Sequence, residues 1–278
     1  MISMIRNKYL TLIGVGLLFT AVSCTDGYEP EPVELVSIDF VFSKTDSLGT
    51  NAVKFMNNIY ATLQNGHNRV GSDYLDAASD DAISINVSDP DVYKLAMGRY
   101  TASTRVESDM RWKEYYSGIR KANILINHID VVPFMLTYKN AKGETKPLNV
   151  TMKAEARFLR AYFYYKLVEA YGPVPIVPET AYDVDASAES MSLERETYEN
   201  CINYICENFE KAYEYLPSSR TSTLVNLPTS GAALALMGRV RLIEASPWYN
   251  GNEFYADWKR SDGTNFMPQV KDESKWGT

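Results

Sequence analysis

The chain has 278 residues, of which 45% are hydrophobic and 23% charged, and its formal net charge is −7. This composition is typical of a globular protein and excludes an intrinsically disordered chain. Because proteins bind nucleic acid through clustered Lys and Arg, the acidic balance also argues against a nucleic-acid-binding function.

The N-terminal residues have the order of a bacterial secretory leader. Arg6 and Lys8 precede the apolar run YLTLIGVGLLFTAV, which is too short for a membrane-spanning helix. The run leads into AVSC, which resembles a lipobox, although Ala21 stands where Leu is usual. We predict a signal peptide over residues 1–23 and lipidation of Cys24. The alternative is an ordinary signal peptide followed by an incidental cysteine.

Residues 24–36 are predicted to be a lipidated tether. The stretch after Cys24, TDGYEPEPVE, is acidic and proline-rich and has no core-forming pattern. Acidic residues directly after the lipid-bearing cysteine resemble the surface-export signal of Bacteroidetes lipoproteins. Because several acyl chains hold a protein stably on a bilayer, this start predicts a surface-exposed lipoprotein of the cell outer membrane.

Helical periodicity dominates the chain beyond the tether. A strand is predicted near Val36–Phe42 and a helix over Thr50–Leu63. A weaker pattern follows, which predicts loops with a short helix near Asp91–Arg99. The next long helix covers about Ser108–Ile129, and Asn123 lies inside it near the apolar face. An amide in that position needs hydrogen-bond partners.

The second half of the chain also reads as mainly helical. Asn149 or Thr151 is predicted to cap a helix that runs to Tyr171. Gly172 and Pro173 end this helix, because Gly accepts the left-handed conformation and Pro has no backbone donor. The other predicted elements are a turn over Asn140–Pro147, a short hairpin around Gly172–Val177, a polar loop over Asp183–Ser190, and helices over Arg195–Leu216 and Thr229–Ala245.

The helix ending at Tyr171 is apolar on two flanks. One flank has Phe158, Ala161, Tyr165 and Val168, and the other has Leu159, Phe163, Leu167 and Ala170. Charged stripes separate the flanks, with Lys153, Arg157 and Arg160 in one and Glu155, Lys166 and Glu169 in the other. Two apolar flanks predict a helix between neighbours, as in a helical solenoid. We expect Arg157 and Arg160 to pair with carboxylates on neighbouring helices.

A residue spacing in this helix recurs later in the chain. Ala161, Tyr165, Val168 and Pro173 have the same spacing as Ala235, Arg239, Leu242 and Pro247. The second helix of a tetratricopeptide repeat has this spacing, from which Arg239 departs. We predict two antiparallel helix pairs, the Ser108–Ile129 helix with the helix ending at Tyr171, and Arg195–Leu216 with Thr229–Ala245.

Cysteine and histidine are scarce in the sequence, with three and two residues respectively. Cys201 and Cys206 lie five residues apart on a predicted helix, about 140° around its axis, and are expected to be buried thiols. His67 and His128, the two histidines, have no metal-ligand spacing. Nucleophile-elbow, phosphate-loop and zinc-protease motifs are also missing from the sequence, and we predict no metal and no cofactor.

Three stretches resemble successive hallmarks of the SusD/RagB family. They are WKEYYSGIRKANILINHID (Trp112–Asp130), AEARFLRAYFYYKLVEAYGPVPIV (Ala154–Val177) and AALALMGRVRLIEASPWYNG (Ala232–Gly251). The resemblance covers about Thr50 to Trp258 and is most specific in the second stretch. It implies a mostly α SusD-like helical fold with tetratricopeptide-like helix pairs and minor β.

The resemblance also implies a function. Family members are surface lipoproteins of Bacteroidetes that bind glycans, or sometimes peptides, and act as a lid on a SusC-like TonB-dependent transporter. By this resemblance the chain captures a polysaccharide or oligosaccharide for such a transporter and is not an enzyme. Because family members continue well past Trp258, residues 37–278 look like an N-terminal region whose C-terminal half, with part of the glycan site, is absent.

Candidate glycan contacts follow from the same resemblance. Sugar rings stack on aromatic faces, and polar side chains orient the hydroxyl groups. The family places several contacts in loops before the helix that begins at Trp112, where this chain has Tyr74, Arg99, Tyr100 and Arg105. Trp248 and Tyr249 form a second candidate surface. For each of these residues the alternative is packing against a helix end.

Two other functions fit parts of the sequence. Helical repeats usually bind proteins, so a lipoprotein scaffold that binds proteins or peptides is the main alternative. A glycoside hydrolase needs two carboxylates flanking the sugar, and nothing in the sequence singles out such a pair.

Overall fold

The computed structural model describes residues 37–64, 66, 74–85, 90–101, 103, 110–180 and 187–276. The predicted leader and tether with Cys24, as well as His67 and Arg105, lie outside these residues. Among the described helices, none combines the length and apolar character needed to cross a membrane.

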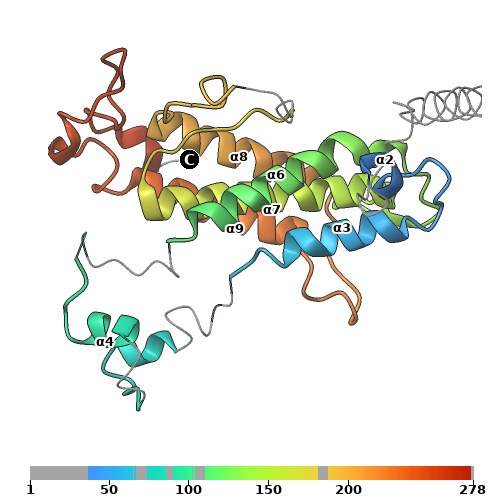
Figure 1. Cartoon of the computed structure of the whole chain (residues 1–278), viewed down its shortest axis with the longest axis horizontal. Coiled ribbons are helices and arrows are strands. Elements are labelled where there is room, and N and C mark those ends of the chain that lie inside the picture. The colour runs from blue at the N-terminus through green and yellow to red at the C-terminus, as the bar shows by residue number, and fades with distance from the viewer. Residues whose placement is uncertain are drawn as a thin grey trace, which may run out of the picture. The chain divides into compact units, whose positions relative to one another are not determined.

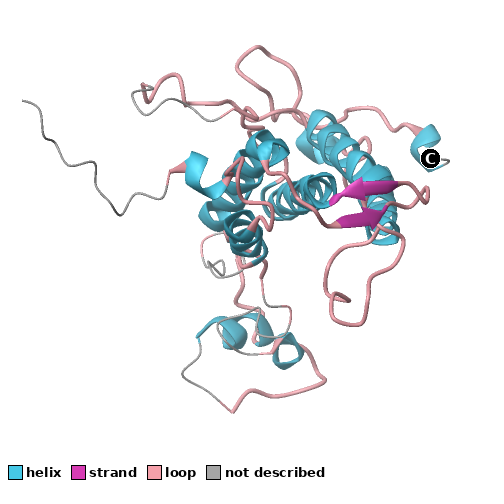
Figure 2. Cartoon of the chain, turned by 90° about the vertical axis from the view of Figure 1, so that its right-hand side faces the viewer, coloured by secondary structure: helices cyan, strands magenta, loops and turns pink. Residues whose placement is uncertain are grey.

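The described chain is mostly helical, which confirms the predicted fold class. The α-helices are α2 (Ile38–Val41), α3 (Thr50–Tyr60), α4 (Pro90–Ala96), α6 (Trp112–His128), α7 (Leu148–Tyr171), α8 (Tyr198–Tyr215) and α9 (Ser230–Ala245). The short 3-10 helices are η1 (Leu75–Ala78), η2 (Ile129–Val131), η3 (Glu253–Tyr255) and η4 (Glu273–Trp276). Two strands, β1 (Thr137–Lys139) and β2 (Thr145–Pro147), pair antiparallel as a small hairpin (Figure 2).

Helix α7 lies between neighbouring helices, as its two apolar flanks predict. It packs against α6 and α8 and also contacts α3. Its core side chains include Leu159, Phe163 and Leu167, which are fully buried. Gly118 of α6 lets the two helices approach closely, because a Cβ there would meet the Phe163 ring at 2.7 Å. The aromatic helix is therefore an interior layer of the bundle.

Both helix pairs run antiparallel, as predicted (Figure 1). At one end of the α6–α7 pair, the rings of Trp112 and Tyr171 lie 4.8 Å apart, and at the other end Lys153 pairs with Asp130. In the α8–α9 pair, Arg241 donates to Asn203 at 3.1 Å. These contacts join the start of one helix to the end of the next, which fixes the antiparallel order.

The repeated spacing is buried in one helix and exposed in the other. Ala161, Tyr165 and Val168 of α7 are buried against α8. The matching side chains of α9 lie on its exposed face, where Leu242 is 61% exposed. The same spacing therefore places residues at equivalent positions of the two helices. Whether their side chains are buried depends on whether another helix packs against that face.

Two predicted β segments are wrong. Val36–Phe42 contains α2, whose turn is closed by Phe42 N donating to Ile38 O at 2.9 Å. A lone strand would leave its backbone unpaired, whereas one helical turn satisfies it locally. Around Gly172–Val177 the chain is extended but forms no strand. Pro173 and Pro175 cannot donate to a ladder. The segment is bonded mainly to side chains, with a backbone bond from Glu196 N to Val174 O at 3.1 Å.

The hairpin forms around the turn predicted over Asn140–Pro147. Asn140 organises it, because its Oδ1 accepts from Glu144 N at 2.8 Å and its Nδ2 donates to Glu144 Oε2 at 3.0 Å. The prediction that Asn149 or Thr151 caps α7 is wrong. Pro147 stands at the cap position, with no side-chain hydrogen bond, and α7 begins at Leu148. The missing N–H of a proline costs nothing at a helix start.

The two cysteines of α8 are buried and free, as predicted. Burial raises the pKa of the Cys201 and Cys206 thiols to about 11, which keeps them protonated and unreactive at neutral pH.

Candidate functional site

The first group of predicted contacts lies around η1 and α4. Tyr74 precedes η1, while Arg99 and Tyr100 follow α4, and all three are exposed. Ala77 of η1 and Val92 of α4 form the small apolar cluster between these two elements. Exposed side chains can contact a ligand, and the glycan contacts of these three residues stay predictions. Arg105 lies outside the described residues.

The second group contains an exposed aromatic platform, formed by Trp248, Phe254 and Tyr255. Trp248 follows α9 and is 56% exposed, and Phe254 on η3 is 79% exposed. The Trp248 and Phe254 rings stack with centroids 6.5 Å apart and an interplanar angle of 25°. Tyr255 meets the Trp248 ring edge-on at 6.0 Å. The two rings are nearly parallel and largely exposed, so they present apolar aromatic surface to the solvent.

Asn252 and the core position the platform. Asn252 Oδ1 accepts from Phe254 N at 3.0 Å, and its Nδ2 donates to Trp248 O at 3.2 Å. These bonds tie η3 to the residues after α9. Behind the platform, the Tyr255 ring contacts Trp258 at 6.2 Å, and Trp258 contacts the buried Phe266 at 4.9 Å. The exposed rings therefore stand on a packed aromatic base rather than on a free loop.

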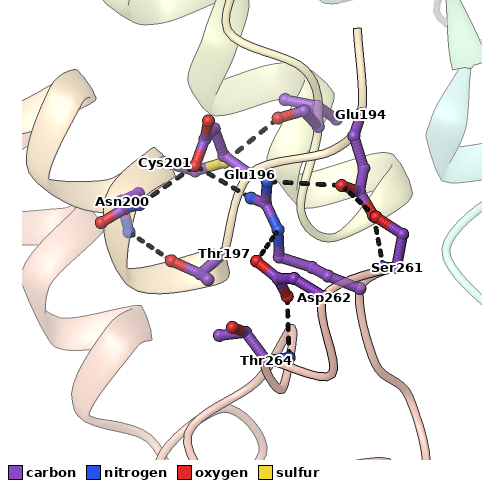
Figure 3. A network of polar contacts seen from close by, with 10 residues as sticks. Glu194, Glu196, Thr197, Asn200, Cys201, Ser261, Asp262 and Thr264 are labelled. Carbon is purple, nitrogen blue, oxygen red and sulfur yellow. Dashed lines mark hydrogen bonds and ion pairs between the residues drawn. The ribbon is translucent and has the colours of Figure 1, made fainter.

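A polar cluster around Arg260 fixes the segment that carries this base, and Figure 3 labels its partners Glu194, Glu196 and Asp262. Arg260 pairs with Glu196 at 3.1 Å and with Glu194 at 3.5 Å. Glu194 also accepts from Ser261 N at 2.7 Å and from Ser261 Oγ at 2.9 Å, and these bonds lower the pKa of its carboxyl group. Tyr198 N donates to Phe266 O at 2.8 Å. The segment is thereby bonded to the start of α8.

Tyr249, the other predicted residue of this group, packs inward. Its ring stacks on the buried Tyr198 at 4.8 Å with an interplanar angle of 5°. Burial raises the pKa of Tyr249. Tyr249 therefore has the packing role that was the alternative to glycan contact for each candidate residue. Trp248 was among the predicted contacts and Phe254 was not, although Phe254 lies in the aromatic run EFYADW close after it.

A separate cavity of about 240 Å³ lies beside α6, and sequence analysis did not predict it. Ile38 of α2, one face of α6 from Tyr116 to His128 and the segment 177–180 line it. The segment is held by side chains of α6. Tyr116 Oη donates to Pro175 O at 2.7 Å, Asn123 Nδ2 to Pro178 O at 3.1 Å, and Asn127 Nδ2 to Glu179 O at 2.8 Å.

Arg160 connects this segment to the bundle. Its side chain is 2% exposed, and it donates to Asn123 Oδ1 at 2.8 Å and to Asn208 Oδ1 at 3.1 Å. The Arg160 guanidinium also forms an ion pair with the Glu179 carboxylate, in which Nη2 and Oε1 are 2.7 Å apart. Asn123 thus has the partners that its buried position requires. The prediction that Arg160 pairs with a carboxylate on a neighbouring helix is wrong. Its carboxylate partner, Glu179, lies in the segment after α7, and its partners on the neighbouring helices are the amide side chains of Asn123 and Asn208.

This architecture of antiparallel helix pairs with minor β is that of a mainly α-helical protein with exposed aromatic side chains beyond α9. A family profile described as "Starch-binding associating with outer membrane" matches residues 44–242. That match covers most of the chain, and the chain belongs to this SusD-like, carbohydrate-binding family.

Curated relatives agree. A SusD-like protein of Bacteroides ovatus is 25% identical over 179 residues, which are 59% of this chain and 30% of that protein. SusD-like protein P38 of Formosa agariphila is 28% identical over 175 residues, or 62% of this chain and 30% of that protein. The chain thus spans about 30% of the length of these relatives.

Solved structures show the same fold. A SusD-like protein from Bacteroides fragilis is 25% identical with a TM-score of 0.54, and the match covers 72% of this chain and 36% of that one. A laminarin-binding SusD-like protein is 21% identical with a TM-score of 0.53, covering 70% of this chain and 40% of the other. At 21% identity, the similarity to the laminarin-binding protein shows a shared fold and nothing about the ligand.

Proposed function

We propose that this protein captures a polysaccharide or oligosaccharide at the cell surface and delivers it to a SusC-like TonB-dependent transporter. The observation that carries the glycan part of the proposal is the platform of Trp248 and Phe254. Membership of a carbohydrate-binding family supports it. Delivery to a transporter and exposure at the surface are inferred from the family resemblance and from the lipobox-like sequence around Cys24.

The platform has the physical properties that glycan capture requires. The C–H face of a sugar is apolar, so it gains from contact with a flat ring, while its hydroxyl groups stay in water. The Trp248 and Phe254 rings are nearly parallel, exposed and supported from behind, so little conformational entropy is lost when a sugar binds. Large exposed aromatic groups on a protein surface mark interaction sites.

We propose binding without catalysis. Glycoside hydrolysis needs two carboxylates placed on either side of a bond, together with a pKa difference between them. The acidic residues of the Arg260 cluster are instead committed to an arginine and to backbone or hydroxyl donors. In the described parts of the chain, no group of three or more His, Cys, Asp or Glu side chains could hold a metal ion.

The test is affinity electrophoresis and titration calorimetry with starch and laminarin. Trp248→Ala and Phe254→Ala should each weaken binding about tenfold, since a stacked aromatic contributes about 0.5–1.5 kcal/mol beyond its buried area. Trp276→Ala is the matched control, because Trp276 on η4 is 51% exposed and is not part of the platform. Unchanged affinity in both platform variants, or an equal loss in the control, would refute the platform as the glycan site.

A further inference from the structure

The cavity beside α6 combines apolar walls with a cationic residue. Ile38, Ile124 and Val177 contribute aliphatic side chains, and the Tyr116 ring adds an aromatic one. Arg120, an exposed residue of α6, also lines the cavity. None of these residues belongs to the aromatic platform, so the cavity is a second feature that glycan capture does not explain.

Several other polar groups of the cavity are already engaged. The Nδ2 atoms of Asn123 and Asn127 donate to backbone oxygens of segment 177–180. Glu179 carries a negative charge, but Arg160 compensates it at 2.7 Å. Arg120 forms no ion pair with any residue that the structure describes, so it supplies the uncompensated charge at this site.

We propose that the cavity binds a small amphipathic carboxylate, with its apolar body between α6 and segment 177–180 and its carboxylate on Arg120. A guanidinium group matches a carboxylate with two parallel hydrogen bonds, which favours an anion over a neutral group of the same shape. The volume of about 240 Å³ is below the range of about 300–1,000 Å³ for drug-sized ligands. One ring with a short acidic chain fits this size.

A neutral sugar fits the cavity less well. A sugar needs several donors and acceptors around its ring, and the amide donors of this cavity are used to hold the wall. The aliphatic side chains would also leave hydroxyl groups unsatisfied. The proposal therefore concerns a ligand class different from that of the aromatic platform, and it does not depend on the proposed function.

The experiment titrates the full chain, purified in detergent, with 3-phenylpropanoate and follows binding by calorimetry and ligand-observed NMR. The neutral 3-phenylpropanamide tests the charge, and acetate tests the apolar body. Arg120→Gln should weaken binding of 3-phenylpropanoate at least tenfold and leave the weak binding of the amide unchanged. The matched control Lys113→Gln removes an exposed cation from the same helix outside the cavity and should bind like the unchanged chain.

A second variant tests the location. Ile124→Trp places a larger side chain in the cavity and should abolish binding, with the helical content checked by circular dichroism. The proposal is wrong if 3-phenylpropanoate does not saturate the chain at millimolar concentration, or if Arg120→Gln binds it normally. It is also wrong if the amide binds as tightly as the carboxylate, or if glucose or a short glucan displaces the carboxylate.

Discussion

At the residue scale, Arg160 shows how a buried charge can hold a non-helical segment in place. It joins amides of α6 and α8 to the carboxylate of Glu179. A buried ion needs both a counter-ion and hydrogen bonds to offset its desolvation, and Arg160 has both. One wall of the cavity therefore depends on a residue of α7.

We predict that Arg160→Ala lowers the free energy of unfolding by at least about 2 kcal/mol, because Asn123 and Asn208 lose a partner inside the protein. Urea unfolding measures this loss. The control is Lys211→Ala, which removes an exposed pair with Glu207 and should change stability by less than about 0.5 kcal/mol. Similar losses in the two variants would mean that the buried network contributes little.

At the element scale, glycines in two helices have different roles. Gly118 of α6 faces the Phe163 ring and the Thr62 side chain, where a Cβ would come within 2.9 Å of both. Gly238 of α9 has nothing within 4 Å of the same position. Helix propensity favours Ala over Gly by about 1 kcal/mol at either site, so only the packing distinguishes them.

We predict opposite effects on stability. Gly238→Ala should raise the free energy of unfolding by about 0.5–1 kcal/mol, and Gly118→Ala should lower it by about 1–3 kcal/mol by forcing α6 away from α7. Thermal and urea unfolding of the two variants measure the difference. A stabilised Gly118→Ala variant would show that α6 and α7 can separate without cost.

At the scale of the whole molecule, the prediction concerns Cys24, which lies outside the described residues. We predict that Cys24 carries lipid and that Cys24→Ala loses both labelling by a palmitate analogue and retention in the membrane fraction. Cys201→Ala, which changes a buried thiol, is the control and should label normally. Equal labelling of Cys24→Ala and the unchanged chain would contradict the lipoprotein assignment.

The sequence by itself determined the helices, because periodicity along a helix depends on residues only three or four positions apart. It also determined that Asn123 needs partners and that the helix ending at Tyr171 is covered on two sides. Two of its errors were in β structure, since a strand exists only when a partner lies beside it. This is why Val36–Phe42 contains a helical turn and the hairpin lies around Asn140. Two others concerned the cap of α7 and the partner of Arg160.

Only the tertiary structure decided which distant residues meet. It brought Glu179 to Arg160, stacked Phe254 on Trp248, turned Tyr249 toward Tyr198, and formed the cavity beside α6. Each of these contacts depends on how helices and loops pack, and packing is set by the shapes of many side chains together. A local pattern can name an aromatic or charged residue, but it cannot say whether that residue faces a neighbour or water.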